Sequence, residues 1–536
     1  MIEKLGGEVS RGILLLAGGA YIIFPVIIAS VFFLIFIRLS SHPSKKSIKK
    51  EKFSSLFLWI TILIYCSIFG TMSILKYFSF RTTFFDLGIY DYAIWNIAKS
   101  GDLSYLSWGH FRPIVGVYAL FYRLFPSAIT LLLLQTLAIG ISAVPLYYIA
   151  REKFRSSYCA LLIVVIYFLY SPVEYNNLAN FHADHLIILL MFLGFYFLEK
   201  KNVVAFLLVC LPGLFLKEPL ILSVSMMGFY ALVRYRMYKS GALLFIGGLL
   251  FFFLVINVIM PGLGRAYYRG GDEGSFSYLG NSVFEIIKTM LFHPGIIVEE
   301  IINVWKIGYL IFLFVPLLLI PLLSPLSLLP ALPALAISLL SRSPNLYWIQ
   351  YQYTASVIAP IFIALIYALK FLNGREESLK SWFKKHLKIN LDKNQLLKTS
   401  LCTILAVSLY YNVVLSPSPI SVLFWKNLRE NYYKTSYVIT ERDRVLNDAI
   451  RRFIPQNSSV VSQNMVNNSY LAHRREYYCF PEQIEDADYV VLDRKRAHYV
   501  KDKLDEEEYE KEFNKLLNSH QIVFSYDGIY IFKRVK

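Results

Sequence analysis

Charged residues are scarce in this sequence. They make up 17% of its 536 residues, whereas soluble globular chains carry about 25%. Cysteine is scarcer still, and its five copies show neither a disulfide framework nor the spacing of a zinc site. The sequence also lacks a Walker A loop, a GxSxG elbow, an HExxH motif and a dinucleotide GxGxxG. These absences argue against an ATP-driven pump and against a membrane zinc protease of those types.

Long apolar runs are abundant instead. Hydrophobic residues make up 56% of the chain, and the mean hydropathy is +0.50. Because the hydrocarbon core of a bilayer is about 30 Å thick, each spanning helix needs about 20 mostly apolar residues. The runs predict an all-α polytopic membrane protein with about twelve transmembrane helices. They lie near residues 12–38, 55–76, 127–150, 157–173, 185–199, 203–216, 219–233, 242–260, 304–323, 325–341, 354–371 and 399–416.

Lysine and arginine are concentrated in alternate loops. Basic residues gather at 45–52, 151–155, 200–201, 234–239 and 370–398. The positive-inside rule places these loops in the cytoplasm. The longer, less basic segments are then external, namely 77–126, 174–184, 261–303, 342–353 and everything after 416. Topology therefore accounts for the formal charge of +17, and no nucleic-acid partner is predicted.

Three parts are predicted along the chain. Residues 1–54 form an additional N-terminal transmembrane helix and a basic cytoplasmic loop, and residues 55–416 form the main transmembrane domain. Residues 417–536 form a small extracellular α/β domain, because a helical face at 445–453 is followed by strand-like runs at 459–462, 489–492, 521–524 and 529–532. Asp527-Gly528 between the last two runs is typical of a hairpin turn. The predicted location is the cell membrane.

The first external loop contains the main candidate for chemistry. It reads FFDLGIYDYAIWN at 84–96, directly after an apolar helix, and GHFRP at 109–113. A carboxyl group that leaves the membrane is poorly hydrated, so we expect its proton affinity to rise toward that of a useful base. Asp86 has this position, whereas Asp91, five residues later, points elsewhere if the segment is helical. The alternative is a polar loop in which Asp86 caps a juxtamembrane helix.

Two further polar clusters are candidates for binding. His182 and His185 share a helical face and could ligate a metal with Asp184, and with Asp86 as a further ligand. Helix-start polar residues more often cap the helix, and contact with a phosphate or sugar is favoured over a metal. No cofactor is predicted, and a divalent cation is the alternative.

Lys217-Glu218 lies between two apolar runs. Ionisable residues near membrane depth are costly and usually face a cavity or each other. The two could form a structural ion pair, or Lys217 could neutralise a phosphate.

Together these motifs resemble the domain-of-unknown-function 2079 family of multi-pass membrane proteins, over about residues 55–536. The matching stretches are FDLGIYDYAIWN (85–96), HFRP (110–113), FH (181–182), LKE (216–218), YLG (278–280), LLSPLSLLPALP (322–333), VVSQN (460–464) and ADYVVLD (487–493). In that family a second acidic residue often follows the Lys-Glu pair. Here Pro219 replaces it.

The family is similar in turn to the GT-C-fold glycosyltransferases, whose donors are polyprenyl-phosphate sugars and whose first external loop begins with an acidic catalytic base. This resemblance implies a membrane glycosyltransferase, inverting, that acts at the external face on a glycan, lipid or protein acceptor of unknown identity. Asp86 would be the catalytic base. Two alternatives remain, namely a transporter or flippase for a lipid or solute and a non-catalytic cell-envelope component. The residues expected to bind phosphate or sugar are Asp91, His110, Arg112, His182, His185, Lys217 and Glu218.

Overall fold

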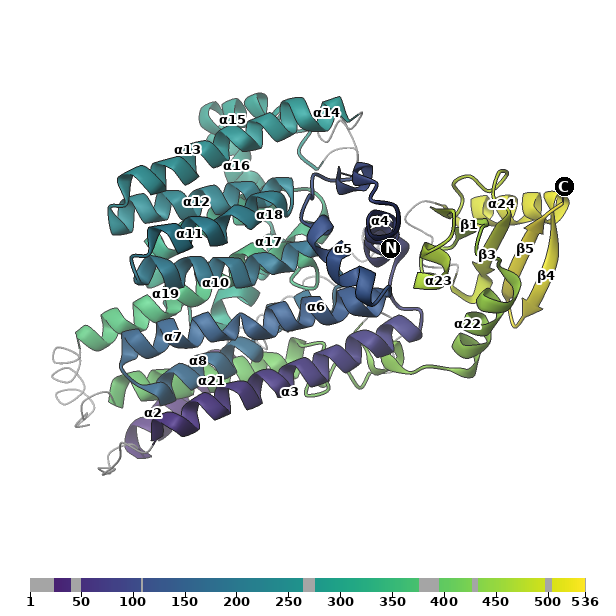
Figure 1. The fold of residues 1–536 in the computed structure, drawn as a ribbon. Coiled ribbons are helices and arrows are strands. Elements are labelled where there is room, and N and C mark those ends of the chain that lie inside the picture. Colours follow the sequence, from purple (N-terminus) through teal and green to yellow (C-terminus); the bar gives the residue numbers. More distant parts are fainter. Residues whose placement is uncertain are drawn as a thin grey trace. The chain divides into compact units, whose positions relative to one another are not determined.

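The computed structural model describes residues 24–39, 50–107, 109–263, 275–375, 395–426, 432–496 and 504–535. It is mostly helical, with one five-stranded sheet near the C-terminus (Figure 1). Most of the basic loops predicted at 39–54 and 372–398 lie outside the described residues, as does the first half of the apolar run at 12–38.

The described helices are numbered along the chain. They are α2 (Phe24–Leu39), α3 (Lys50–Phe78), α4 (Ile89–Ser100), α5 (Val115–Leu124), α6 (Ala128–Ile141), α7 (Ala143–Phe154), α8 (Ser157–Phe168), α9 (Ser171–Leu178), α10 (Leu186–Glu199), α11 (Val203–Cys210), α12 (Glu218–Tyr235), α13 (Tyr238–Leu254), α14 (Met260–Gly262), α15 (Val283–Phe292), α16 (Pro294–Ile301), α17 (Val304–Phe314), α18 (Leu332–Leu340), α19 (Ala355–Gly374), α21 (Gln395–Leu415), α22 (Glu441–Phe453), α23 (Ser469–Ala472) and α24 (Glu506–Ser519).

The chain divides by its internal packing into two units. Unit 1 contains residues 1–65, 138–176 and 184–424, and unit 2 contains residues 66–137, 177–183 and 425–536. Unit 2 therefore combines the loop after the first predicted span of the main domain, a short segment before α10, and the C-terminal sheet.

Five described helices are long and apolar enough to cross a bilayer. They are Ser54–Phe78, Ala128–Phe154, Tyr238–Gly262, Gln352–Gly374 and Gln395–Leu415. The count becomes six within the described residues if α8 and α9, which meet at a 51° bend, form one span. The expected number of about twelve spans is not confirmed.

Proline explains why several predicted segments fall short of a span. It has no backbone N–H and clashes with the preceding helical turn. The 203–216 segment changes to a 3₁₀ helix at Leu211–Phe215, where Pro212 is near the start. The 325–341 segment begins with a 3₁₀ helix at Pro325–Ala331 that contains Pro330. These segments are apolar helices, but each is interrupted.

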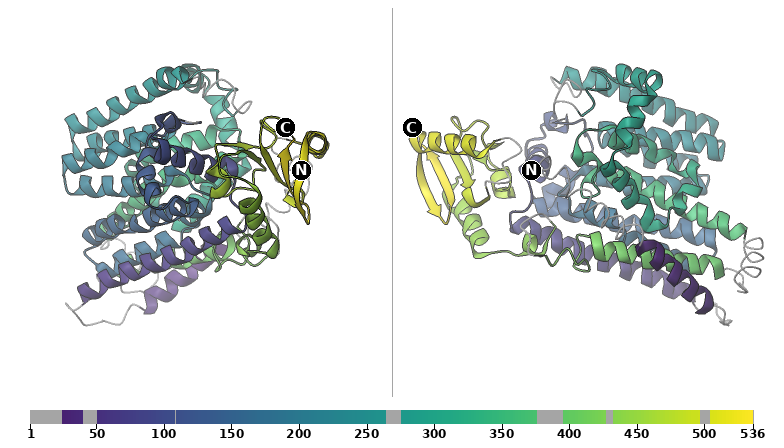
Figure 2. Two further views of the ribbon diagram at one scale, coloured as in Figure 1. Left: turned by 45° about the vertical axis from the view of Figure 1, so that its right-hand side comes forward. Right: turned by 180° about the vertical axis from the view of Figure 1, so that it is seen from behind.

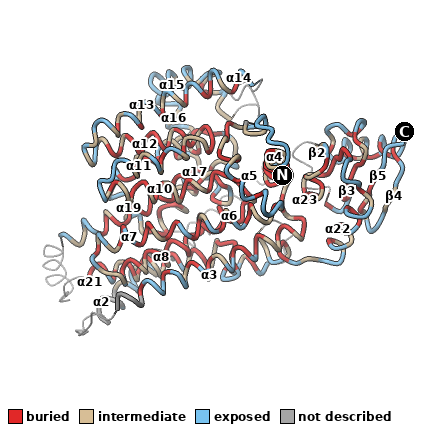
Figure 3. Tube along the Cα trace, viewed as in Figure 1, coloured by how far each residue is buried: buried red, intermediate tan, exposed pale blue. Residues whose placement is uncertain are grey.

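Unit 1 is a bundle in which α7, α8, α10, α12, α13, α19 and α21 run side by side (Figure 2). Helix α19 is central, since every residue from Ala355 to Ile366 is buried (Figure 3). Helices α12 and α13 approach closely at glycines, because a Cβ atom on Gly228 would lie 2.6 Å from the Phe245 backbone nitrogen.

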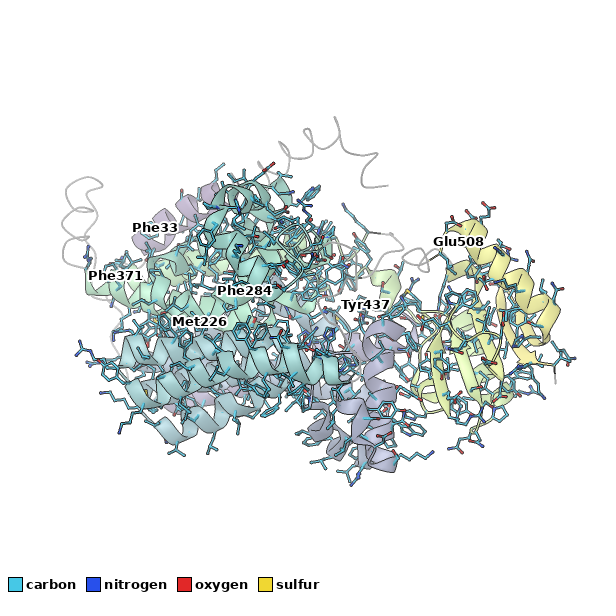
Figure 4. All side chains as sticks on the ribbon, turned by 90° about the horizontal axis from the view of Figure 1, so that it is seen from above. Phe33, Met226, Phe284, Phe371, Tyr437 and Glu508 are labelled. Carbon is cyan, nitrogen blue, oxygen red and sulfur yellow. The ribbon has the colours of Figure 1, made fainter. Side chains whose placement is uncertain are left out.

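Two helices in unit 1 occupy a stretch predicted to be a long loop. In α15 and α16 no residue is buried, although both helices are rich in apolar side chains. Phe284, for example, is 76% exposed (Figure 4). Their apolar residues recur with a helical period. The helices have only 10 and 8 residues, so neither was predicted as a membrane span.

The C-terminal part of unit 2 is an α/β layer structure. Its strands are β1 (Ser459–Ser462), β2 (Glu476–Cys479), β3 (Tyr489–Asp493), β4 (His520–Tyr526) and β5 (Ile529–Arg534), in the order β2-β1-β3-β5-β4. Strands β1, β2 and β3 are parallel, and β5 is antiparallel to β3 and β4. The four predicted strands and the predicted helix are confirmed, whereas β2 and α24 were not anticipated.

Alternating side chains of the sheet make two hydrophobic layers. Val460, Val491 and Ile531 pack with α22 and α23. Val461, Val490 and Phe532 pack with α24, which lies on the opposite face of the sheet (Figure 2). Since successive strand residues point to opposite faces, this pattern follows directly from the sequence.

Candidate functional site

Asp86 lies in a short π-helical turn, η3 (Phe84–Gly88), between the end of α3 and the start of α4. The Gly88 N–H donates to the Thr83 carbonyl at 3.1 Å, which closes the wide turn. π-helical turns are rare and are often found at functional sites.

The Asp86 carboxylate has three polar partners in unit 2. Asn180 Nδ2 and Thr83 Oγ1 donate to Asp86 Oδ2 at 2.8 Å and 2.9 Å. His182 Nε2 lies 3.3 Å from Asp86 Oδ1, and the Asp86 side chain remains 33% exposed. A carboxylate that is held on both oxygens and still partly exposed can accept a further hydrogen bond from a ligand.

These partners change the acidity of Asp86. Burial alone would raise its pKa, but the adjacent His182 and the hydrogen bonds from His182, Asn180 and Thr83 outweigh burial and lower the pKa of Asp86 from 3.8 to about 2. The expected rise in proton affinity is therefore wrong in direction. Asp86 is an ionised carboxylate at any physiological pH.

The segment that supplies Asn180 and His182 is held in place by two predicted spans. Gln135 Nε2 donates to the carbonyls of Asn177 and Asn180 at 2.9 Å and 2.8 Å, and Gln135 Oε1 accepts from the His182 N–H at 2.9 Å. Lys76 Nζ donates to the Leu178 carbonyl at 2.6 Å. Asn180 itself has a φ of 68°, a left-handed conformation that asparagine tolerates better than most residues.

Arg112 joins the same group through an aromatic ring. Its guanidinium lies 4.2 Å from the ring centroid of Tyr90. The Tyr90 ring in turn lies 5.7 Å from the imidazole of His182, edge to face. Arg112 is buried, and His110, two residues earlier, is half-buried. Unit 2 therefore gathers Asp86, Arg112 and His182 from three separate segments.

Asp91 belongs to a different group of side chains in unit 2. It is only 1% exposed, accepts a short hydrogen bond from the Tyr122 hydroxyl, and lies 3.2 Å from His473 Nε2. The imidazole of His473 is 2.9 Å from the Tyr122 hydroxyl and stacks on Trp95 with ring centroids 5.0 Å apart. Asp91 thus connects α4 and α5 to the C-terminal layer structure.

The other predicted binding residues are in unit 1. Lys217 Nζ lies 3.4 Å from Asp184 Oδ2, and both side chains are nearly buried. His185 and Glu218 are also buried, and Glu218 is the first residue of α12. Lys217 therefore has an acidic partner, Asp184, in addition to Glu218, its neighbour in the sequence.

Asp86, His182, Asp184 and His185 were also considered as metal ligands, as the alternative to contact with a phosphate or sugar. In the part of the chain that the structure describes, no three or more His, Cys, Asp or Glu side chains are grouped so that they could hold a metal ion.

Several residues around Asp86 were missed by sequence reasoning. Asn180 precedes the FH motif by one residue, and Asn464 closes the VVSQN motif, so their positions beside those stretches were the available signal. For Gln135, the only signal in the sequence was a polar residue within an apolar run.

A profile of predicted membrane proteins, DUF2079, matches residues 76–530. The chain belongs to the DUF2079 family. This confirms the resemblance inferred from the motifs and makes the chain a membrane protein. No curated protein matches this DUF2079 chain.

Two solved structures are distantly similar to this DUF2079 protein. ArnT from Cupriavidus metallidurans bound to undecaprenyl phosphate has a TM-score of 0.47 and 11% sequence identity, covering 90% of this chain and 98% of that chain. ArnT from the same organism in the apo state has a TM-score of 0.45 and 12% identity, covering 89% and 98%.

Proposed function

We propose that this protein is a membrane glycosyltransferase that transfers a sugar from a polyprenyl-phosphate donor to an acceptor hydroxyl at the external membrane face. The observation that carries the proposal is the Asp86 carboxylate. It lies eight residues after a candidate span ending at Phe78, is partly exposed, and is held by His182, Asn180 and Thr83.

The proposed reaction is a single displacement. The acceptor oxygen forms a bond to the anomeric carbon while the bond from that carbon to the phosphate oxygen breaks, and the electron pair leaves with the lipid phosphate. The hydroxyl proton passes to Asp86, and the configuration is inverted. A carboxylate with a pKa of about 2 is a weak base. It suffices here because the acceptor hydroxyl becomes strongly acidic as its oxygen bonds to an oxocarbenium-like carbon.

Cationic side chains would stabilise the departing phosphate. Arg112 lies over the Tyr90 ring, that ring contacts His182, and His182 Nε2 lies 3.3 Å from Asp86 Oδ1. Lys217 was also a candidate to neutralise a phosphate; it lies in unit 1, where its Nζ is 3.4 Å from Asp184 Oδ2.

Asp86→Asn tests the proposal because it keeps the shape of the side chain and removes its basicity. We expect transfer to fall by about 10²- to 10⁴-fold, the range of general-base contributions, while undecaprenyl phosphate still binds. The assay uses reconstituted protein, radiolabelled undecaprenyl-phosphate hexoses and extracted cell-envelope material as the acceptor.

The matched control is Asp102→Asn, an exposed aspartate in the same loop, which should transfer at the normal rate. Transfer at the normal rate by Asp86→Asn would remove Asp86 from the mechanism. If undecaprenyl phosphate does not bind the unaltered protein, the proposed type of donor is wrong.

A further inference from the structure

The π-helical turn that carries Asp86 is capped by a residue from the C-terminal part of the chain. The first N–H groups of a helical turn have no partner within it. Thr83 directs its hydroxyl to Asp86 and makes no side-chain cap. Asn464 supplies the missing acceptors instead. The Phe84 N–H reaches the Asn464 carbonyl at 2.7 Å and Asn464 Oδ1 at 3.0 Å, and the Phe85 N–H reaches Oδ1 at 3.4 Å.

Asn467 holds the same turn from a second direction. Its Nδ2 donates to the Thr83 carbonyl at 3.3 Å, and its Oδ1 accepts from the Tyr477 hydroxyl at 3.2 Å. The side chain is only 1% exposed. It passes so close to the turn that a Cβ atom on Gly88 would lie 2.9 Å from Asn467 Oδ1.

The location of these asparagines in the sheet is informative. Strand β1 is flanked by β2 and β3, both parallel to it, and β1 ends at Ser462. In parallel α/β sheets the crevice beyond the carboxyl ends of such strands is the usual ligand site. Here the residues that follow β1 bind the Asp86 turn of the same chain, and Phe80 and Phe84 complete the adjoining hydrophobic layer.

A second attachment fixes the helix that follows the turn. His473, directly after α23, lies 3.2 Å from Asp91 Oδ1 in α4. The segment from 464 to 473 therefore contacts both the Asp86 turn and α4, and it links them to the sheet.

We propose that Asn464 and Asn467 are positioning residues, which fix the backbone of the Asp86 turn and so aim its carboxylate. The C-terminal part of the chain thereby builds the site. This inference rests on the role proposed above for Asp86, and it concerns residues that do not touch the substrate.

The test combines backbone hydrogen exchange with transfer kinetics on the full-length protein in nanodiscs. In Asn464→Ala we expect the amides of 84–88 to exchange about 2- to 30-fold faster, the range expected for loss of an N-cap. We expect kcat to fall by up to about 10²-fold, as for misplaced catalytic groups, with the donor KM unchanged. Asn464→Asp keeps the acceptor oxygen and should restore both. The control is Asn457→Ala, an exposed asparagine of the same domain.

A second variant guards against misfolding. Asn467→Asp keeps the acceptor for Tyr477 but removes the donor to Thr83, and it should also speed exchange in 84–88. Unchanged exchange in both variants would overturn the proposal whatever the transfer rate. Faster exchange with normal transfer, in a protein that Asp86→Asn inactivates, would also overturn it. If Asp86→Asn is fully active, the proposed function loses its base, while the exchange data still decide whether the asparagines hold the turn.

Discussion

Asp86 and Asp91 lie five residues apart and have contrasting surroundings. Asp86 is 33% exposed, so its side chain is accessible from solvent. Asp91 is 1% exposed and is enclosed by Tyr122 and His473. Burial without access to solvent suits a structural carboxylate, because a substrate would have to displace those partners first. Under the proposed function, Asp86 would carry the chemistry, whereas Asp91 would attach α4 and α5 to the C-terminal layer structure.

His182→Gln tests the electrostatic part of the site. The pKa of Asp86 is lowered to about 2 chiefly by His182, against the effect of burial. Removing the imidazole should move that pKa upward, toward or above the ordinary 3.8. The stabilisation that ionised Asp86 contributes is complete above pH 3.8 and is lost as pH falls toward 2. In the variant, ionised Asp86 should contribute less stabilisation, and the part that remains should be fully lost at a higher pH than in the unaltered protein. Infrared titration of the carboxyl band that is missing in Asp86→Asn measures the shift.

His293→Gln is the matched control, since His293 lies at the end of α15 in unit 1. It should leave the Asp86 band unchanged. A band that titrates at the same pH in His182→Gln and in the unaltered protein would show that His182 does not set the acidity of Asp86.

At the residue scale, the sequence singles out Asp86 and His182 as candidates, but it does not predict which side chains surround them. Asp86 can be predicted because it follows an apolar run, and His182 because it opens another. The lowered pKa of Asp86 cannot be predicted, because its partner Asn180 is 94 residues away in the chain. Nothing in local patterning says that the two will share a hydrogen bond.

Among the elements, the π-helical turn depends on a glycine for space. Gly88 has a φ of −62°, which alanine adopts readily, so Gly88→Ala adds only a methyl group. That methyl would overlap Asn467. We expect a loss of about 1–3 kcal/mol in the free energy of unfolding, as for other overpacked sites, measured by denaturant unfolding in detergent. Exchange of the 84–88 amides should also be faster.

Gly247→Ala is the control for this substitution. Gly247 lies inside α13, and a Cβ atom there would meet nothing within 4 Å. Its unfolding free energy should stay constant or rise by up to about 1 kcal/mol, the helix propensity difference. If Gly88→Ala has the same unfolding free energy as the parent protein, then the Asn467 side chain can move aside without loss of stability.

Elements are predictable here to the extent that their periodicity is unbroken. The α22 face and the strands β1, β3, β4 and β5 follow from local pattern. Strand β2 (Glu476–Cys479, EYYC) is as short as β1 (SVVS), but it lacks the β-branched valines that favour a strand prediction for β1. The predicted number of about twelve spans is not confirmed among the described residues, and two of the predicted segments contain proline. Apolar composition continues through Pro212 and Pro330 although the α-helix does not.

At the scale of the whole molecule, the basic loops predicted to share one side of the membrane meet within unit 1. Lys153 pairs with Glu199, and Lys200 Nζ lies 2.7 Å from Glu152 Oε2. Arg234 lies 5.6 Å from the ring of Tyr367. The ends of α7, α10, α12 and α19 are therefore together. This agrees with the alternation of charge from which the orientation was predicted.

Thiol labelling in intact cells tests that orientation. On a background without the five native cysteines, we expect an impermeant maleimide to label Asp102→Cys and Glu507→Cys. Lys239→Cys should react only after permeabilisation, because its basic loop is placed in the cytoplasm. All three side chains are exposed in the structure, so protection would report the membrane and not burial. Labelling of Lys239→Cys in intact cells, with Glu507→Cys protected, would reverse the orientation. It would also place Asp86 on the cytoplasmic side, where a transferase could use a nucleotide-sugar donor directly, and the proposed lipid-linked donor would lose its rationale.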